Sequence, residues 1–299
     1  MIPARVRSAS SSGGARERRA ISSEATTQPI VLIHGLWLTP RSWEGWVERF
    51  ESRGNRVLAP PWPRMQGEVE DIRRDPSPLN GLGVGEITDH YAEVVRGLDR
   101  PPIIIGHSFG GLVTELMLDR GLGAAGVANS PAPVKGVLRL PLAQLPSALP
   151  AFKSPANRNK TVQLSPAQFH YAFTNTMGDA EARAAYERYQ IPGPGRPLFQ
   201  AAVANFNPNA PTRLDLHNAD RAPLLVIGND HDHTVPAAVS KEAARRLGRS
   251  GASVEYREFA GRPHFTGIAP GWEDVADKAL EWARSHARAP ADAGQAGGA

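Results

Sequence analysis

The sequence contains no cysteine in its 299 residues. This absence excludes disulfides, thiolate nucleophiles and cysteine-bound metals. A chain without disulfides suits a reducing compartment, and we expect a cytoplasmic location. Long apolar runs are also missing, because the most apolar stretches, such as residues 102–106, are too short to cross a bilayer. No apolar segment follows the early arginines, so residues 1–28 do not resemble a signal peptide. We therefore expect no membrane span.

The excess of positive charge is small and is confined to the start of the chain. The formal net charge is +4, and residues 1–28 hold five arginines against two glutamates, a net of +3 that leaves +1 elsewhere. Surfaces that bind nucleic acid usually combine basic stripes with aromatic residues, and the rest of the chain has no such stripe. We expect no nucleic-acid partner. Residues 1–28, rich in Ser, Arg and Gly, and the Ala/Gly-rich residues 287–299 are interpreted as flexible tails.

Between these tails, short apolar runs alternate with amphipathic segments. This order predicts an α/β fold with a mostly parallel sheet of about six strands and helices on both faces. The expected strands are residues 29–33, 56–59, 102–105, 126–129, 224–227 and 254–259. The last of them alternates more between polar and apolar residues, which suits a sheet edge. The expected helices are residues 40–53, 85–98, 110–120, 236–247 and 271–286.

Residues 130–216 break this rhythm. They are rich in proline and aromatic residues, and they are too long for a plain connection between two strands. We interpret them as a helical lid inserted into a core formed by residues 29–129 and 217–286. Helices are expected near residues 165–175 and 179–189, with Ser165 and Asp179 as their N-caps. The candidates in this insertion for lining a substrate pocket are Phe152, Phe169, Phe173 and Phe206.

A Gly-x-Ser-x-Gly pattern, residues 106–110, lies between an apolar run and a helical segment. Gly106 and Gly110 allow a sharp strand-to-helix turn that exposes the hydroxyl of Ser108 in a strained conformation. The turn also places Ser108 at a helix N-terminus, where backbone N–H groups favour a developing anion. The pattern predicts that Ser108 is a nucleophile.

A serine hydroxyl needs a base, and the base needs a carboxylate that orients it. His264 follows the last expected strand and precedes the last helix, which is where this mechanism requires the base. Two residues, Asp230 and Asp232, follow the strand at residues 224–227, and either could supply the carboxylate. His231 and His233 lie beside them, but neighbouring residues on a turn rarely converge on one ion, so no metal site is expected.

Together these segments resemble the α/β-hydrolase superfamily, specifically its small lidded esterase and lipase-like branch, over about residues 29–286. The chain order Ser, Asp, His is the order that this fold uses. The resemblance favours Asp232 as the third member of a triad with Ser108 and His264, because Asp-x-x-Val-Pro is closer to the family pattern. Asp230 remains the alternative.

The resemblance also implies a role for the loop His34-Gly35-Leu36-Trp37, which follows the first expected strand. In this family such a loop supplies one oxyanion donor and the residue after the nucleophile supplies the other. The backbone N–H groups of Leu36 and Phe109 are therefore the expected oxyanion hole. Trp37 and His107 are further candidates for the substrate pocket.

Two features depart from the family pattern. No strong strand candidate precedes the strand at residues 29–33 that leads into His34, so the family's first two strands are absent or concealed, which is consistent with a minimal sheet. Ser108 also stands where dehalogenases and epoxide hydrolases of this superfamily carry aspartate, which argues against both activities.

The expected function is hydrolysis of a carboxylic ester or lactone through an acyl-enzyme, without a cofactor. The aromatic insertion predicts a small-molecule substrate that is largely apolar. Two alternatives stay open, since one fold hosts many functions. The same residues could serve a lyase or another tailoring enzyme that acts on a biosynthetic intermediate, or the pocket could belong to a non-catalytic receptor. The oligomeric state is not determined by the sequence.

Overall fold

A computed structural model describes residues 28–137 and 150–289. Its central feature is a six-stranded sheet with the order β2-β1-β3-β4-β7-β8, in which every pair of neighbours is parallel. The strands are β1 Ile30–Ile33, β2 Val57–Leu58, β3 Ile103–His107, β4 Ala125–Asn129, β7 Leu224–Asn229 and β8 Val254–Phe259. The predicted parallel sheet of about six strands is therefore confirmed.

The burial of the strands follows their sequence patterns. β1, β3, β4 and β7 are buried along their whole length, as continuous apolar runs require when both faces of a sheet are covered. β8 is only partly buried and lies at one edge, which confirms the prediction from its alternating pattern.

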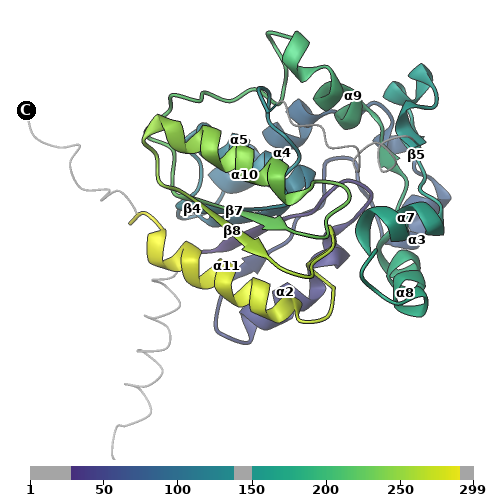
Figure 1. Ribbon diagram of the computed structural model, residues 1–299, viewed down its shortest axis with the longest axis horizontal. Helices are drawn as coiled ribbons and strands as arrows, with labels where there is room; N and C mark the ends of the chain where they lie inside the picture. The colour runs from purple at the N-terminus through teal and green to yellow at the C-terminus, as the bar shows by residue number, and fades with distance from the viewer. Residues whose placement is uncertain (1–27, 138–149, 290–299) are drawn as a thin grey trace, which may run out of the picture.

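Helices cover both faces of the sheet (Figure 1). Side chains of successive strand residues point to opposite faces, and β1 shows this alternation directly. Val31 and Ile33 join one apolar cluster, whereas Ile30 and Leu32 join another. The first cluster packs under α4 Val84–Arg96, α5 Phe109–Asp119 and α10 Ala237–Leu247, and the second packs under α2 Glu44–Glu51 and α11 Trp272–His286.

Two local predictions need correction. The helix expected over residues 40–53 is divided into a 3₁₀ turn, Pro40–Trp43, and α2, because Thr39 caps the turn and Trp43 leaves the α-helical conformation. Asp179 is not an N-cap: Gly178 has the extended backbone of the cap, and Asp179 is the first helical residue. Ser165, in contrast, is confirmed as an N-cap, since its side chain accepts a hydrogen bond from the backbone N–H of Gln168.

The inserted segment contains α7 Pro166–Phe173 and α8 Asp179–Tyr189, the two helices that the sequence predicts. It also contains elements that the sequence analysis missed. Two short strands, β5 Thr161–Val162 and β6 Gly193–Pro194, pair in an antiparallel way. The others are the helix α9 Arg196–Ala202 and two 3₁₀ turns, Pro155–Asn159 and Ala204–Phe206. A further missed helix, α3 Val69–Arg74, lies in the connection between β2 and α4.

In Figure 1, α3, α7, α8 and β5 lie together beyond the carboxyl ends of β7 and β8. The expected tails and residues 138–149 of the expected lid lie largely or wholly outside the described residues. Within the described ranges, no helix is long and apolar enough to span a bilayer.

The register of the sheet brings the chemistry-bearing turns to one edge. His107 at the end of β3 pairs with Asn129 at the end of β4, and Asn129 pairs with Ile227 near the end of β7. The segments that follow these strands therefore emerge side by side, as expected for the carboxyl edge of a parallel sheet.

Candidate active site

Ser108 lies at the turn between β3 and α5. Its backbone has φ 56° and ψ −119°, a sparsely populated conformation for a residue with a Cβ atom. The flanking glycines make the turn possible: a Cβ atom on Gly106 would overlap the carbonyl of Gly110, and one on Gly110 would overlap the carbonyl of Ile33. Neither position accepts a larger residue without a backbone shift, so the elbow depends on both glycines.

Asp232 and His264 form a buried pair at the same edge of the sheet. Nδ1 of His264 lies 2.7 Å from Oδ2 of Asp232, and neither side chain is exposed. The other carboxylate oxygen, Oδ1, accepts hydrogen bonds from the backbone N–H groups of Thr234 and Val235, both at 2.7 Å. Three donors thus converge on one carboxylate and hold it in a fixed orientation.

Asp230, the alternative carboxylate, has a different place. Its Oδ1 accepts a hydrogen bond from the backbone N–H of Arg262 at 3.1 Å, and its side chain is 32% exposed. Asp230 therefore connects the turn after β7 to the loop that precedes His264. The carboxylate that contacts the imidazole is that of Asp232.

The second ring nitrogen of His264 is available for chemistry. Among the described residues, Nε2 of His264 has no hydrogen-bond partner although it is buried. The ring lies 4.6 Å from that of His107 and meets the ring of Phe173 edge-on at 5.0 Å, both measured between ring centroids. A neutral imidazole whose Nδ1–H is held by a carboxylate presents Nε2 as a proton acceptor.

His107 connects the elbow to the loop of His264. Its Nε2 donates a hydrogen bond to the carbonyl oxygen of His264 at 2.9 Å. Burial, and next the proximity of His264, lower the pKa of His107 well below its usual value, so that its ring is neutral. His107, the residue directly before Ser108, thus holds the backbone of His264 and links the elbow to that loop.

The loop of residues 34–37 lies directly against the elbow. A Cβ atom on Gly35 would come within 3.0 Å of the Cβ atom of Ser108, so only glycine allows this close approach. The ring of His34 stacks on Trp62 with 5.1 Å between centroids, and its Nε2 accepts a hydrogen bond from the backbone N–H of Trp62 at 3.3 Å. Burial lowers the pKa of His34 to about 4, which keeps the ring neutral and able to accept this bond.

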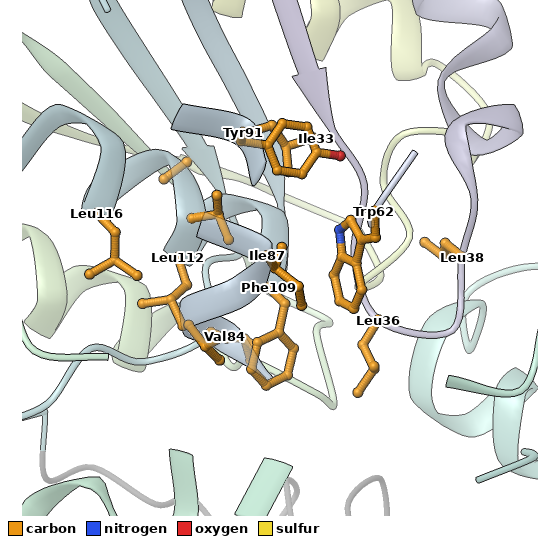
Figure 2. Close-up of a cluster of buried hydrophobic side chains, with 14 of the residues drawn as sticks. Ile33, Leu36, Leu38, Trp62, Val84, Ile87, Tyr91, Phe109, Leu112 and Leu116 are labelled. Atoms are coloured by element: carbon orange, nitrogen blue, oxygen red, sulfur yellow. The ribbon is translucent and has the colours of Figure 1, made fainter. Parts of the chain in front are cut away.

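The residues expected to form an oxyanion hole are both buried, Leu36 with 1% and Phe109 with 5% of their surface exposed. Figure 2 shows their side chains in one cluster with Trp62, and both extend to the same side in this view. Trp62 was missed by the sequence analysis. Its indole N–H also donates to the carbonyl of His34 at 3.2 Å, so it holds the loop twice. No local sequence signal indicates this role, because the contact joins segments 28 residues apart.

The aromatic residues of the insertion divide into two groups. Phe169 and Phe173 are buried and stack on each other, and Phe173 also contacts Trp37 with 6.1 Å between centroids. Through Phe173, this group contacts the ring of His264. Phe152 and Phe206 do not join them. Phe152 packs on Phe199 and is 39% exposed, whereas Phe206 is 89% exposed, which does not fit a residue that lines an enclosed pocket.

Phe265 is a further residue that the sequence analysis missed. Its ring stacks with that of His107 and meets those of Phe169, Phe173 and Tyr189 edge-on. The position directly after His264 was the only sequence signal available for it.

The site is closed in this structure. Ser108 is 4% exposed, Asp232 is 3% exposed and His264 is fully buried. A groove of about 320 Å³ lies elsewhere, between residues 64–67 and α3, and none of these three residues lines it. Within residues 28–137 and 150–289, no group of three or more His, Asp or Glu side chains is arranged to hold a metal ion.

A parallel sheet covered by helices on both faces, with a serine at a strained strand-to-helix turn and a buried Asp–His pair at the carboxyl edge, defines the α/β-hydrolase class of enzymes. Comparison with family models gives the same result: the model of the Alpha/beta hydrolase family matches residues 30–293. The chain belongs to this family, and the expected fold and superfamily are confirmed.

Solved structures agree on the fold. An extracellular α/β-hydrolase from a Paenibacillus species, described as sharing structural and functional homology with tobacco salicylic acid binding protein 2, superposes with a TM-score of 0.60 at 20% identity, covering 86% of this chain and 99% of that chain. A methylesterase from Arabidopsis gives a TM-score of 0.60 at 10% identity over 87% and 100% of the two chains. The monoacylglycerol lipase of Paleococcus ferrophilus gives 0.57 at 21% identity over 88% and 97%. No curated protein sequence matches the chain.

Proposed function

We propose that this α/β hydrolase is a serine esterase that cleaves a carboxylic ester or lactone with an apolar group. The observation that carries the proposal is the buried hydrogen bond between His264 and Asp232, with Nε2 of His264 unpartnered among the described residues, at the edge of the sheet where Ser108 follows the strand β3. This is the arrangement that a serine nucleophile requires from a general base and its orienting carboxylate.

In the proposed reaction, Oγ of Ser108 attacks the ester carbonyl and its proton passes to Nε2 of His264. The ionised Asp232 stabilises the imidazolium through Nδ1. The tetrahedral oxyanion accepts hydrogen bonds from two backbone N–H groups, that of Leu36 and that of Phe109. Phe109 is the first residue of α5, where the helix N-terminus also favours a negative charge. His264 then returns the proton to the leaving alcohol as the C–O bond breaks, which leaves an acyl group on Ser108.

Water completes the cycle. It attacks the acyl carbonyl while His264 takes one of its protons, and the collapse of the second tetrahedral intermediate returns that proton to Oγ of Ser108 and releases the acid. A lactone would follow the same steps with its alcohol retained in the product.

The surroundings of the proposed site favour an apolar substrate. Leu36 and Trp37 in the loop of residues 34–37, and Phe109 in the elbow, are buried apolar residues. Phe173 packs on Trp37, on Phe169 and on the ring of His264. Apolar walls with few polar groups are typical of pockets that bind small organic molecules. The names of similar structures, among them a methylesterase and a lipase, are consistent with ester hydrolysis.

The test is release of p-nitrophenol from acetate, butyrate and octanoate esters by the wild type, Ser108→Ala and the control Ser240→Ala. Ser240 is buried in α10 and its hydroxyl has no hydrogen-bond partner among the described residues, so its removal should leave turnover unchanged. Ser108→Ala should lower kcat by about 1000-fold or more. Wild-type turnover of no ester, or turnover that survives in Ser108→Ala, would contradict the proposal and favour lyase or receptor functions.

A further inference from the structure

The C-terminal end of α7 is hydrogen-bonded to both loops of the Asp–His pair. The last carbonyl groups of a helix have no intrahelical partner and need donors from elsewhere. In α7 the carbonyl oxygens of three consecutive residues, 171–173, accept hydrogen bonds from residues that flank Asp232 or His264. These bonds are His233 Nδ1 to Tyr171 at 3.1 Å, Thr234 Oγ1 to Ala172 at 2.7 Å and the backbone N–H of Phe265 to Phe173 at 2.9 Å.

Two more contacts join the same parts. The side-chain amide of Asn175, just beyond α7, donates to the carbonyl oxygen of His231 at 2.9 Å. The ring of Phe173 meets that of His264 edge-on. Residues on both sides of Asp232, and the residue after His264, are therefore held by one helix end, which comes from the inserted segment rather than from the sheet.

Thr234 connects this helix end to the carboxylate itself. Its backbone N–H donates to Oδ1 of Asp232 at 2.7 Å, while its hydroxyl donates to the carbonyl of Ala172. With Oδ1 occupied by Thr234 and Val235, Oδ2 is the oxygen that faces Nδ1 of His264. The rotation of the carboxylate thus depends on a residue whose side chain is anchored in α7.

We propose that Thr234 is a positioning residue, and that through it the end of α7 sets the geometry of the Asp232–His264 pair. This inference rests on the proposed function in so far as it concerns turnover. It also assigns α7 a fixed place: a movement that lifted this helix would break the bonds that orient Asp232.

The experiment compares Thr234→Val with Thr234→Ser and Thr212→Val. Thr234→Val keeps the shape and the backbone N–H but removes the hydroxyl, whereas Thr234→Ser retains it. Thr212→Val is the matched control, because Thr212 is fully buried and its hydroxyl has no hydrogen-bond partner in the part of the chain that the structure describes. Thr234→Val should lower kcat by about tenfold with little change in KM. The acidic limb of the pH profile of kcat/KM should move to lower pH, since a misaligned carboxylate stabilises the imidazolium less.

A second readout does not require turnover. The Nδ1 proton of His264, held at 2.7 Å from Asp232, should give a far-downfield NMR resonance in the wild type. That resonance should shift or broaden in Thr234→Val and persist in Thr234→Ser and Thr212→Val. If no ester is hydrolysed, the proposed function fails while this resonance still tests the positioning role.

Unchanged kcat, pH profile and resonance in Thr234→Val would overturn the inference. If Thr234→Val does not fold, Asn175→Ala carries the test, because it removes the bond to His231 at a partly exposed position. A smaller shift in the same direction is expected for Asn175→Ala, and an unchanged resonance and pH profile there would also overturn the inference.

Discussion

At the scale of single residues, the turn after β7 shows how two like side chains acquire different roles. Asp230 and Asp232 are two positions apart, and both follow an apolar strand. Asp232 is buried and contacts His264, whereas Asp230 is partly exposed and bonds to the backbone of Arg262. Sequence reasoning could name both candidates. It could choose between them only through a family pattern, because the choice depends on a loop that lies about 30 residues further along the chain.

These environments predict different consequences of removing each charge. Asp232→Asn should lower kcat by on the order of 1000-fold, because the amide no longer stabilises the imidazolium and can orient the wrong tautomer. Asp230→Asn should retain kcat within about threefold, since an amide oxygen can still accept from Arg262. Steady-state kinetics on the best p-nitrophenyl ester decide the matter. Equal losses in both variants would contradict the assignment of Asp232.

Much of the candidate site could be predicted from its residues. Ser108 and His264 each follow a strand and are indicated by local patterns, whereas Asp232 is preferred to Asp230 only through the family pattern. Three other residues could not be predicted, because their contacts join distant parts of the chain. Trp62 contacts His34, Phe265 contacts Phe173, and Thr234 contacts Ala172. Phe206, a candidate pocket residue in the sequence analysis, lies in a 3₁₀ turn and is 89% exposed, and its aromatic side chain alone gives no indication of the direction in which it points.

At the scale of elements, the helices and strands of the core follow from hydrophobic periodicity, and the small elements of the insertion do not. α4 and α11 each have one apolar face, and their bounds agree with the sequence within about two residues. β5 and β6 have two residues each, which is too short for any periodic signal. They exist because they pair with each other over the loop of Leu36 and Trp37, where the indole N–H of Trp37 donates to Val162 at 3.0 Å.

This close packing predicts a site at which one methyl group affects function. A Cβ atom on Gly193 would lie 2.9 Å from Cδ1 of Trp37 and 3.1 Å from its backbone nitrogen, so β6 or the loop must move. Gly193→Ala should lower stability by about 1–3 kcal/mol and lower kcat/KM through displacement of the oxyanion loop. Thermal unfolding and ester kinetics measure the two effects.

The matched control for this change is Gly85→Ala in α4. A Cβ atom there meets nothing within 4 Å, and alanine in a helix should stabilise the protein by about 0.5–1 kcal/mol. If Gly193→Ala kept both the stability and the kcat/KM of the wild type, the close contact of β6 with the loop would not constrain the site.

At the scale of the whole molecule, the core contains an acid that makes stability depend on pH. Glu115 lies in the middle of α5 with no exposed surface, and within residues 28–137 and 150–289 neither of its carboxylate oxygens has a hydrogen-bond partner. Burial raises the pKa of Glu115 to about 8, although the nearby Arg221 opposes the shift. Arg221 is itself buried and pairs with Asp119, one turn further along α5. The helix that starts at Ser108 thus contains a group that prefers to be neutral.

The sign of the effect follows from linkage. Because the folded pKa of Glu115 is higher than the unfolded value of 4.5, the stabilising contribution is full below about pH 4.5 and is lost as pH rises through 8. The free energy of unfolding falls by roughly 3–5 kcal/mol when this contribution is lost. Glu115→Gln should therefore lose less stability than the wild type between pH 6 and 9, as measured by urea unfolding. Exposed Glu281→Gln is the control and should follow the wild-type curve, and a Glu115→Gln curve parallel to it would contradict the prediction.

The bonds between the end of α7 and the loops of Asp232 and His264 also limit how the insertion can be exchanged. In engineering terms, this insertion is not an independent module that can be replaced by the corresponding segment of a relative. A transplanted cap would have to include partners for residues 231–234 and 265, or those loops would have to be transferred with it. Chimeras that cross over before α7 take the helix and these loops from the same parent and retain the contacts, whereas chimeras that cross over between α7 and α8 separate the helix from the loops that it contacts.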